Sequence, residues 1–269
     1  MKIIFNSSMP RSGSELLQVL LHQNPRIYGS STSPLLEYQF AARSNYEIPE
    51  VKAQDARQQH TAFIAMCKGM AESYYSAITD RPIVCDKSRG WLHYYEWVDQ
   101  WNPDPKIICC VRDIRSIIAS LEKIYRNNRH RPTGPDNPIQ MTEMTVMDRA
   151  NYWLSTQPVG LALQRIQDTF QRDMGKKIHW VRYEDLCNSP QQELDKLYIF
   201  IGEPSFVHDF TNIKKKVQED DSVFGVFGSH KVASNIRAAE VADWSNVLPK
   251  DVANHVKQSC AWYQDAFNY

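Results

Sequence analysis

The segment that most constrains the fold is residues 106–111, Lys-Ile-Ile-Cys-Cys-Val. Five consecutive apolar residues leave no polar face, which predicts a strand buried on both sides, as in the centre of a parallel sheet. Shorter strands are predicted at 2–6, 83–85 and 177–181. Helical patterns lie between and after these strands, at 14–23, 57–78, 91–101, 113–124, 190–200 and 249–263. The alternation predicts one α/β domain over residues 1–269, with a central, mostly parallel sheet flanked by helices.

Composition excludes several classes of protein. A formal net charge of +0 argues against a general nucleic-acid binder, which needs a basic excess to displace counterions from phosphates. The sequence has no secretory leader pattern and no run of 18 apolar residues, so we expect a soluble, cytoplasmic protein without a membrane span. The six cysteines show no CxxC spacing, which favours buried thiols in a reducing compartment. No spaced His/Cys/Asp/Glu cluster predicts a metal.

A short polar loop, residues 7–14, separates the first predicted strand from the first predicted helix. Backbone N–H groups and the helix dipole at such a position favour an anion. Gly13 permits close approach of the backbone, Ser12 and Ser14 supply hydroxyl donors, and Arg11 supplies charge. The loop differs from a Walker A loop, because Gly13 is followed by serine and not by lysine. A capped helix after a turn explains the same residues without a ligand.

A second candidate anion site follows the central strand. Arg112 stands at the carboxyl end of that strand, and Ser120 lies eight residues later in the next helix. Ligands of open α/β sheets bind at such strand ends, where arginine offers a forked, charged donor. The alternative for Arg112 is a surface ion pair with Asp113 or Glu122.

The run Pro-Arg-Ser-Gly-Ser-Glu-Leu-Leu, residues 10–17, resembles the 5′-phosphosulfate loop of sulfotransferases that use 3′-phosphoadenosine 5′-phosphosulfate (PAPS), typically P-R-S-G-T-T-L-L. Ser14 stands for the first threonine and Glu15 for the second. Val-Arg-Asp at 111–113, with Ser120, resembles the family's 3′-phosphate motif. The resemblance implies the P-loop NTPase-like sulfotransferase fold. It also implies donor binding by Arg11, Ser12, Gly13, Ser14, Glu15, Arg112 and Ser120, with Arg126 at the offset of a further arginine in tyrosylprotein sulfotransferases.

Two later segments extend the resemblance. Val-Arg-Tyr-Glu-Asp-Leu at 181–186 is similar to a family segment whose tyrosine lies beside adenine, which implies a stacking or hydrogen-bonding role for Tyr183. Residues 225–231 have the shape G-x-x-G-x-x-K and resemble part of the lid of cytosolic sulfotransferases. Ser229 and Lys231 are therefore candidate donor-binding residues. The alternative for 225–231 is a glycine-rich surface loop.

Sulfuryl transfer needs in-line attack and neutralisation of charge on the leaving phosphate. Arg11 and Lys87, which follows the second predicted strand, are the candidates for that neutralisation. Cytosolic family members carry a base histidine in a K-x-H segment, but this chain has Arg89 there. The candidate bases are therefore Glu37 and His93, although a solvated glutamate and a packed histidine explain them equally well.

The sequence as a whole predicts a PAPS-dependent sulfotransferase that acts on a hydroxyl or amine of a small-molecule, glycan or peptide acceptor and releases 3′-phosphoadenosine 5′-phosphate (PAP), with no metal. One alternative is a P-loop kinase, in which residues 83–86 would be the Walker B-like strand. The other is a non-catalytic nucleotide-binding module that has the fold but no base.

Overall fold

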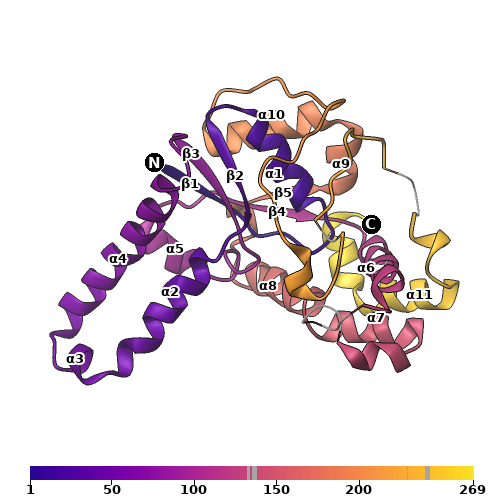
Figure 1. The fold of residues 1–269 in the computed structure, drawn as a ribbon, viewed down its shortest axis with the longest axis horizontal. Coiled ribbons are helices and arrows are strands. Elements are labelled where there is room, and N and C mark those ends of the chain that lie inside the picture. Colours follow the sequence, from indigo (N-terminus) through magenta and orange to yellow (C-terminus); the bar gives the residue numbers. More distant parts are fainter. Residues whose placement is uncertain (132–133, 135–137, 229, 240–242) are drawn as a thin grey trace.

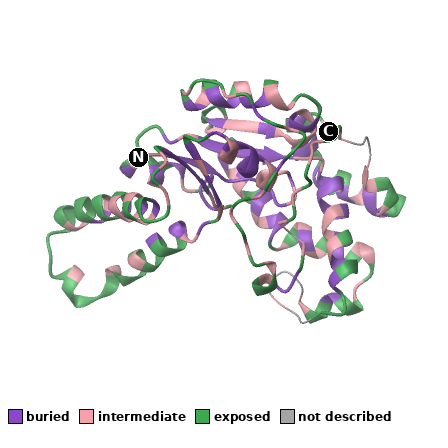
Figure 2. Ribbon diagram, turned by 45° about the horizontal axis from the view of Figure 1, so that its top comes forward, coloured by how far each residue is buried: buried purple, intermediate pink, exposed green. Residues whose placement is uncertain are grey.

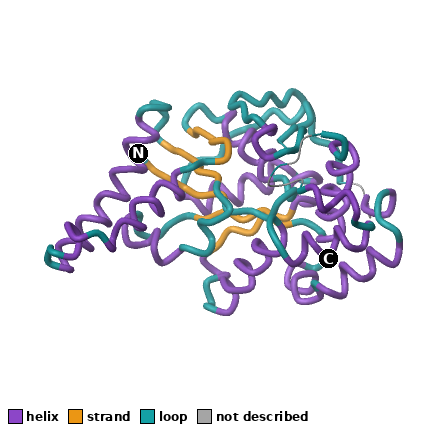
Figure 3. The backbone as a smooth tube through the Cα atoms, turned by 60° about the horizontal axis from the view of Figure 1, so that its bottom comes forward, coloured by secondary structure: helices purple, strands orange, loops and turns teal. Residues whose placement is uncertain are grey.

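The fold is built on a five-stranded sheet, seen in a computed structural model that describes residues 1–131, 134, 138–228, 230–239 and 243–269. All strand pairs in the sheet are parallel, and the order is β2-β3-β1-β4-β5. The strands are β1 (Lys2–Asn6), β2 (Ile27–Thr32), β3 (Ile83–Lys87), β4 (Ile107–Val111) and β5 (Ile178–Arg182). Figure 3 shows these strands inside a layer of helices. The predicted α/β class with a parallel central sheet is confirmed.

Helices cover both faces of the sheet (Figure 1). One face packs against α1, α9 and α10, and the other packs mainly against α4 to α8, α11 and α12. The bounds are α1 Ser14–Gln23, α2 Leu35–Ser44, α3 Pro49–Lys52, α4 Ala56–Ser76, α5 Tyr95–Trp101, α6 Ile114–Asn128, α7 Val146–Ser155, α8 Val159–Gln171, α9 Tyr183–Asn188, α10 Pro190–Ile201, α11 Lys250–Ser259 and α12 Ala261–Phe267.

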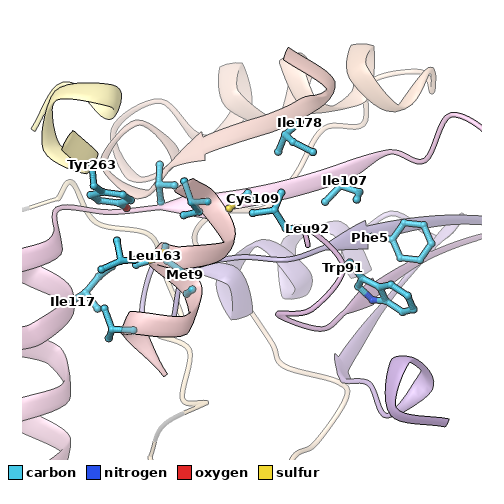
Figure 4. Packing of buried hydrophobic residues seen from close by; sticks show 14 of the residues in the cluster. Phe5, Met9, Trp91, Leu92, Ile107, Cys109, Ile117, Leu163, Ile178 and Tyr263 are labelled. Atoms are coloured by element: carbon cyan, nitrogen blue, oxygen red, sulfur yellow. The ribbon is translucent and has the colours of Figure 1, made fainter. Parts of the chain in front are cut away.

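Strand residues alternate between the two cores. Cys109 belongs to the core on the α6 side, and the next residue, Cys110, belongs to the core on the α1 side. On the α6 side, the ring of Phe5 packs at 4.8 Å from the ring of Trp91 (Figure 4). All six cysteines are buried free thiols, as the absence of CxxC spacing predicted.

The sequence prediction missed one strand, β2, which is Ile-Tyr-Gly-Ser-Ser-Thr. This segment is too polar to match the pattern of a buried strand. Gly29 is nevertheless needed there, because a Cβ at this position would lie 2.4 Å from the carbonyl oxygen of Gln18. Three helix bounds also differ from the prediction. The helix predicted at 91–101 begins at Tyr95, α6 continues to Asn128 beyond the predicted end at 124, and the last helix is divided at Cys260.

Helices α2, α3 and α4 form an arm that projects from the sheet (Figure 1). Its outer part is largely exposed, as Figure 2 shows. Within the described ranges, no helix has both the length and the apolar character needed to cross a bilayer.

Candidate functional site

A cavity of about 700 Å³ lies at the carboxyl edge of the sheet. Four of its lining residues stand at, or directly after, the carboxyl ends of different strands: Asn6 at the end of β1, Lys87 at the end of β3, Arg112 after β4 and Tyr183 after β5. The loop before α1 and residues 230–239 complete much of its wall. This is the edge at which parallel α/β sheets bind their ligands.

The loop before α1 has a backbone suited to an anion. Arg11 and Gly13 have positive φ values of 59° and 89°, and Gly13 is the N-cap of α1, so no side chain caps the first turn. Arg11, Gly13 and Ser14 line the cavity. The Ser12 hydroxyl instead donates to the carbonyls of Met9 (2.7 Å) and Cys110 (2.9 Å) and is fully buried. Ser12 therefore fastens the loop to β4, and its side chain is turned away from the cavity.

The ring of Tyr183 forms one wall of the cavity. It lies against Gly13, where an added Cβ would be 2.6 Å from the ring carbon Cδ2. The guanidinium of Arg112 stacks on the same ring, with Cζ 4.2 Å from the ring centroid. Burial raises the pKa of Tyr183 to about 12, so the ring carries a neutral hydroxyl near neutral pH. The site thus combines a glycine loop, a flat aromatic surface and a stacked cation.

Two arginines approach each other across the loop. Arg112 donates to the carbonyl of Arg11 (3.2 Å), and Arg11 Nε donates to Ser120 Oγ (3.1 Å). Burial, and then the neighbouring charge of Arg112, lowers the pKa of Arg11. Like charges in such a place favour an anionic ligand, since an anion relieves their repulsion.

Arg112 also binds a carboxylate. Its Nη2 donates to Asp243 Oδ2 (2.6 Å), and the Ser116 hydroxyl donates to the other carboxylate oxygen. Arg112 Nε is buried and makes no hydrogen bond among the described residues. The alternative of an ion pair with Asp113 or Glu122 is wrong, because Arg115 pairs with Asp113, and Arg149 and Arg126 pair with Glu122.

Glu15 belongs to a compact group of four charged side chains. Its carboxylate lies 2.5 Å from Lys87 Nζ and 2.6 Å from Lys215 Nζ. Glu219 lies 3.7 Å from Lys87 and 3.8 Å from Lys215. Burial alone would raise the pKa of Glu15, but the two lysines outweigh burial and lower it. Glu15 is therefore an anchor for both lysines, and its carboxylate is committed to them.

The structure places the other predicted site residues as follows. Lys231 lines the cavity, whereas Ser229 is outside the described residues. Arg126 is half-exposed on α6, away from the lining, and donates to Glu122 (2.8 Å).

Neither candidate base lies on the cavity. Glu37 is exposed on α2, and His93 pairs with Asp168 at 3.1 Å and is also exposed. Sequence reasoning saw each as a titratable residue near a functional segment, but the structure leaves both side chains exposed to solvent.

Sequence reasoning missed three residues around this cavity: Lys215, Glu219 and Asp243. All three come from the region between α10 and α11, which has only short 3₁₀ turns among its described residues. The one feature of the sequence that indicated a charged site here was the run of lysines at 214–216. No hydrophobic periodicity around this run predicts which of these side chains faces the cavity.

Comparison with known proteins agrees with this geometry. A family model described as the sulfotransferase family matches residues 4–208. No curated protein sequence matches the chain. The described residues contain no group of three or more His, Cys, Asp or Glu side chains arranged for a metal ion.

Solved structures show the same fold at low sequence identity. The sulfotransferase domain from the curacin biosynthetic pathway is 19% identical, with a TM-score of 0.60, and the match covers 97% of each chain. Mouse sulfotransferase SULT7A1, crystallised with PAP, is 18% identical, with a TM-score of 0.54, over 96% of this chain and 82% of the mouse chain. Retinol dehydratase, in complex with retinol and PAP, is 13% identical, with a TM-score of 0.51, over 98% of this chain and 81% of the other.

Proposed function

Because this chain belongs to the sulfotransferase family, we propose that it transfers a sulfuryl group from PAPS to a hydroxyl or amine of an acceptor and releases PAP. The observation that carries the proposal is the arrangement of Arg112. Its guanidinium stacks on Tyr183, reaches the loop before α1, and has a buried Nε without a partner among the described residues. A cation held in this way fits the 3′-phosphate, which distinguishes PAPS from ordinary adenine nucleotides.

The residues around the cavity fit the rest of the donor. Gly13 leaves no room for a side chain against Tyr183, so the loop backbone is free to approach a phosphate closely. Ser14 and Arg11 add a hydroxyl and a positive charge at the start of α1. Tyr183 offers its face to adenine, and the 3′-phosphate would take the place of the Asp243 carboxylate on Arg112.

Arg11 and Lys87 supply the charge that the leaving phosphate needs. Both line the cavity, and Lys87 is oriented by Glu15 at 2.5 Å. Positive side chains placed in advance stabilise developing negative charge without reorganising solvent. Lys231, which lines the same cavity, is a further donor contact in this proposal.

One contact favours sulfuryl transfer over the kinase alternative. Asp86, the candidate magnesium carboxylate of a Walker B-like strand, is fully buried. It accepts hydrogen bonds from Tyr75 (2.5 Å) and from Trp91 (2.6 Å), and burial raises its pKa. Its carboxylate is therefore bonded to core side chains and does not line the cavity.

The acceptor and the compartment remain part of the proposal. Retinol dehydratase has been crystallised with retinol and with androsterone, which supports a small-molecule acceptor, with glycan and peptide hydroxyls in the same chemical class. The six buried free thiols are consistent with a reducing compartment such as the cytoplasm.

Calorimetric titration with PAP in the absence of magnesium tests the proposal. We expect PAP to bind much more tightly than adenosine 5′-monophosphate or magnesium ATP. Arg112→Ala should weaken PAP binding by about 10- to 100-fold, since a hydrogen bond to a charged group contributes about 1.5–3 kcal/mol. Ser120→Ala should have a smaller effect, because its hydroxyl acts through Arg11.

Arg43→Ala is the matched control, because Arg43 lies on the α2 arm against Tyr46 and does not line the cavity. It should bind PAP as the unmodified protein does. If the 3′-phosphate made no difference to affinity, or if only magnesium ATP bound, the proposed function would be wrong.

A further inference from the structure

With Glu37 and His93 outside the cavity, another group must accept the acceptor's proton. His230 is a histidine on the cavity wall, with a side chain that is 15% exposed. Its Nδ1 makes a hydrogen bond with the Asp221 carboxylate, and its backbone N–H donates to the same carboxylate at 3.2 Å. Asp221 thus fixes both the position of the ring and the nitrogen that carries the proton.

The second ring nitrogen is available. His230 Nε2 makes no hydrogen bond among the described residues, and Glu219 Oε1 lies 3.7 Å from it. In a neutral imidazole, a proton held on Nδ1 by a carboxylate leaves Nε2 unprotonated, which is the form a general base requires. The cavity, the Asp221 contact and the free Nε2 together describe an oriented base.

His230 also lies near the two side chains that would neutralise the leaving phosphate. Glu219, beside His230 Nε2, is 3.7 Å from Lys87 Nζ. Asp221, beside His230 Nδ1, exerts an attractive charge on Arg11. The imidazole therefore belongs to the same end of the cavity as Arg11 and Lys87.

We infer that His230 is the general base of the sulfuryl transfer and that Asp221 is its positioning residue; this inference rests on the proposed function. The acceptor oxygen or nitrogen forms a bond to the sulfur of PAPS, and its proton moves to Nε2. The bond between sulfur and the bridging phosphate oxygen breaks, and its electron pair remains on the 5′-phosphate of PAP. His230 then returns the proton to water.

Several charged groups surround His230. From its own region come Lys215, which donates to the His230 carbonyl at 3.2 Å, together with Glu219 and Asp221. Three further charged groups lie behind these residues. Glu15 on α1 pairs with Lys215, Lys87 on β3 lies near Glu219, and Arg11 of the loop is attracted by Asp221. The pH dependence of transfer reflects all of these charged groups together. Replacing His230 should remove the acidic limb of the pH–rate profile.

The test compares His230→Gln and Asp221→Asn with the unmodified protein, using PAPS as donor and 4-nitrophenol, 2-naphthol and water as acceptors. Release of inorganic sulfate measures transfer to water. We expect His230→Gln to lower kcat about 100- to 10,000-fold and to remove the acidic limb of the pH–rate profile, with PAP affinity by calorimetry unchanged. Asp221→Asn should cause a smaller loss. The loss should be smallest for 4-nitrophenol, the acceptor that is ionised most readily.

A readout independent of turnover is the histidine ring spectrum by heteronuclear NMR. His230 should show a proton on Nδ1 and none on Nε2, and Asp221→Asn should shift the tautomer equilibrium. His255→Gln is the matched control, because His255 is half-buried on α11 beside Asn151 and lies off the cavity.

Each outcome separates the two hypotheses. If PAP does not bind, or if no acceptor including water is sulfated, the proposed function fails. If PAP binds and transfer occurs, but His230→Gln retains the rate and the acidic limb, His230 is not the base. If His230→Gln instead lowers PAP affinity with kcat unchanged, His230 is a donor contact and the inference is overturned.

Discussion

Lys215→Met is the substitution that most directly tests the charge balance beside the phosphate loop. Glu15 is held by Lys87 at 2.5 Å and by Lys215 at 2.6 Å, and Glu219 completes a group of two positive and two negative charges. Removing Lys215 leaves a net negative charge next to the start of α1. The donor's phosphosulfate would have to bind against that charge.

The expected size follows from burial and distance. Breaking a fully buried ion pair costs about 3–5 kcal/mol. Glu15 keeps Lys87, and the three side chains are 11–16% exposed, so we expect a loss of about 1–2 kcal/mol in the free energy of unfolding. For an assumed separation of about 6 Å, a like charge opposes a bound phosphate by about 3 kcal/mol at an effective dielectric of about 20. Solvent screening should reduce this to about 1.4 kcal/mol, a tenfold loss of PAP affinity.

Calorimetry with PAP and denaturant unfolding measure the two effects separately. Glu15→Gln alone should bind PAP at least as tightly as the unmodified protein, because it frees Lys87 and removes a negative charge. The double variant Glu15→Gln/Lys215→Met should recover the affinity lost by Lys215→Met. Lys68→Met is the control, since Lys68 is exposed on α4, 4.0 Å from Glu72.

Two results would refute this reasoning. Lys215→Met could bind PAP as tightly as the unmodified protein, which would mean that Glu15 is not close enough to the phosphate to repel it. Alternatively, the double variant could bind PAP as weakly as Lys215→Met alone, which would mean that the loss does not come from the uncompensated charge of Glu15.

Two further predictions concern stability. Gly13→Ala should destabilise the fold by about 1–3 kcal/mol and weaken PAP binding, because φ is 89° and the Cβ would meet the Tyr183 ring at 2.6 Å. Gly69 lies inside α4 with open space around it, so Gly69→Ala should instead stabilise the fold by about 0.5–1 kcal/mol, as measured by denaturant unfolding. Burial lowers the pKa of His208 from 6.5 to about 4, so the folded state disfavours its charged form and stability should fall as pH drops from 6.5 toward 4. His208→Gln should flatten that part of the stability–pH curve, and an unchanged slope would contradict the assignment.

Much of the sheet could be predicted from residue patterns because burial on both faces requires uninterrupted apolar residues, as in β4. The loop before α1 could be predicted for a similar reason, since a glycine and small polar residues between a strand and a helix have few other uses. β2 could not be predicted, because Gly29 is required by close packing on α1, a contact absent from the local sequence.

The charged residues of the cavity show where sequence reasoning stops. Glu15 departs from the sulfotransferase loop pattern, and a carboxylate beside a phosphate site must be compensated by a nearby cation. That requirement is local and can be inferred from the loop alone. The compensating Lys215 lies 200 residues later, in a region without long helices or strands, so its position depends on the completed fold. The same holds for Asp243 on Arg112 and for Asp221 on His230: the sequence indicates the need for a partner, and tertiary structure determines its identity.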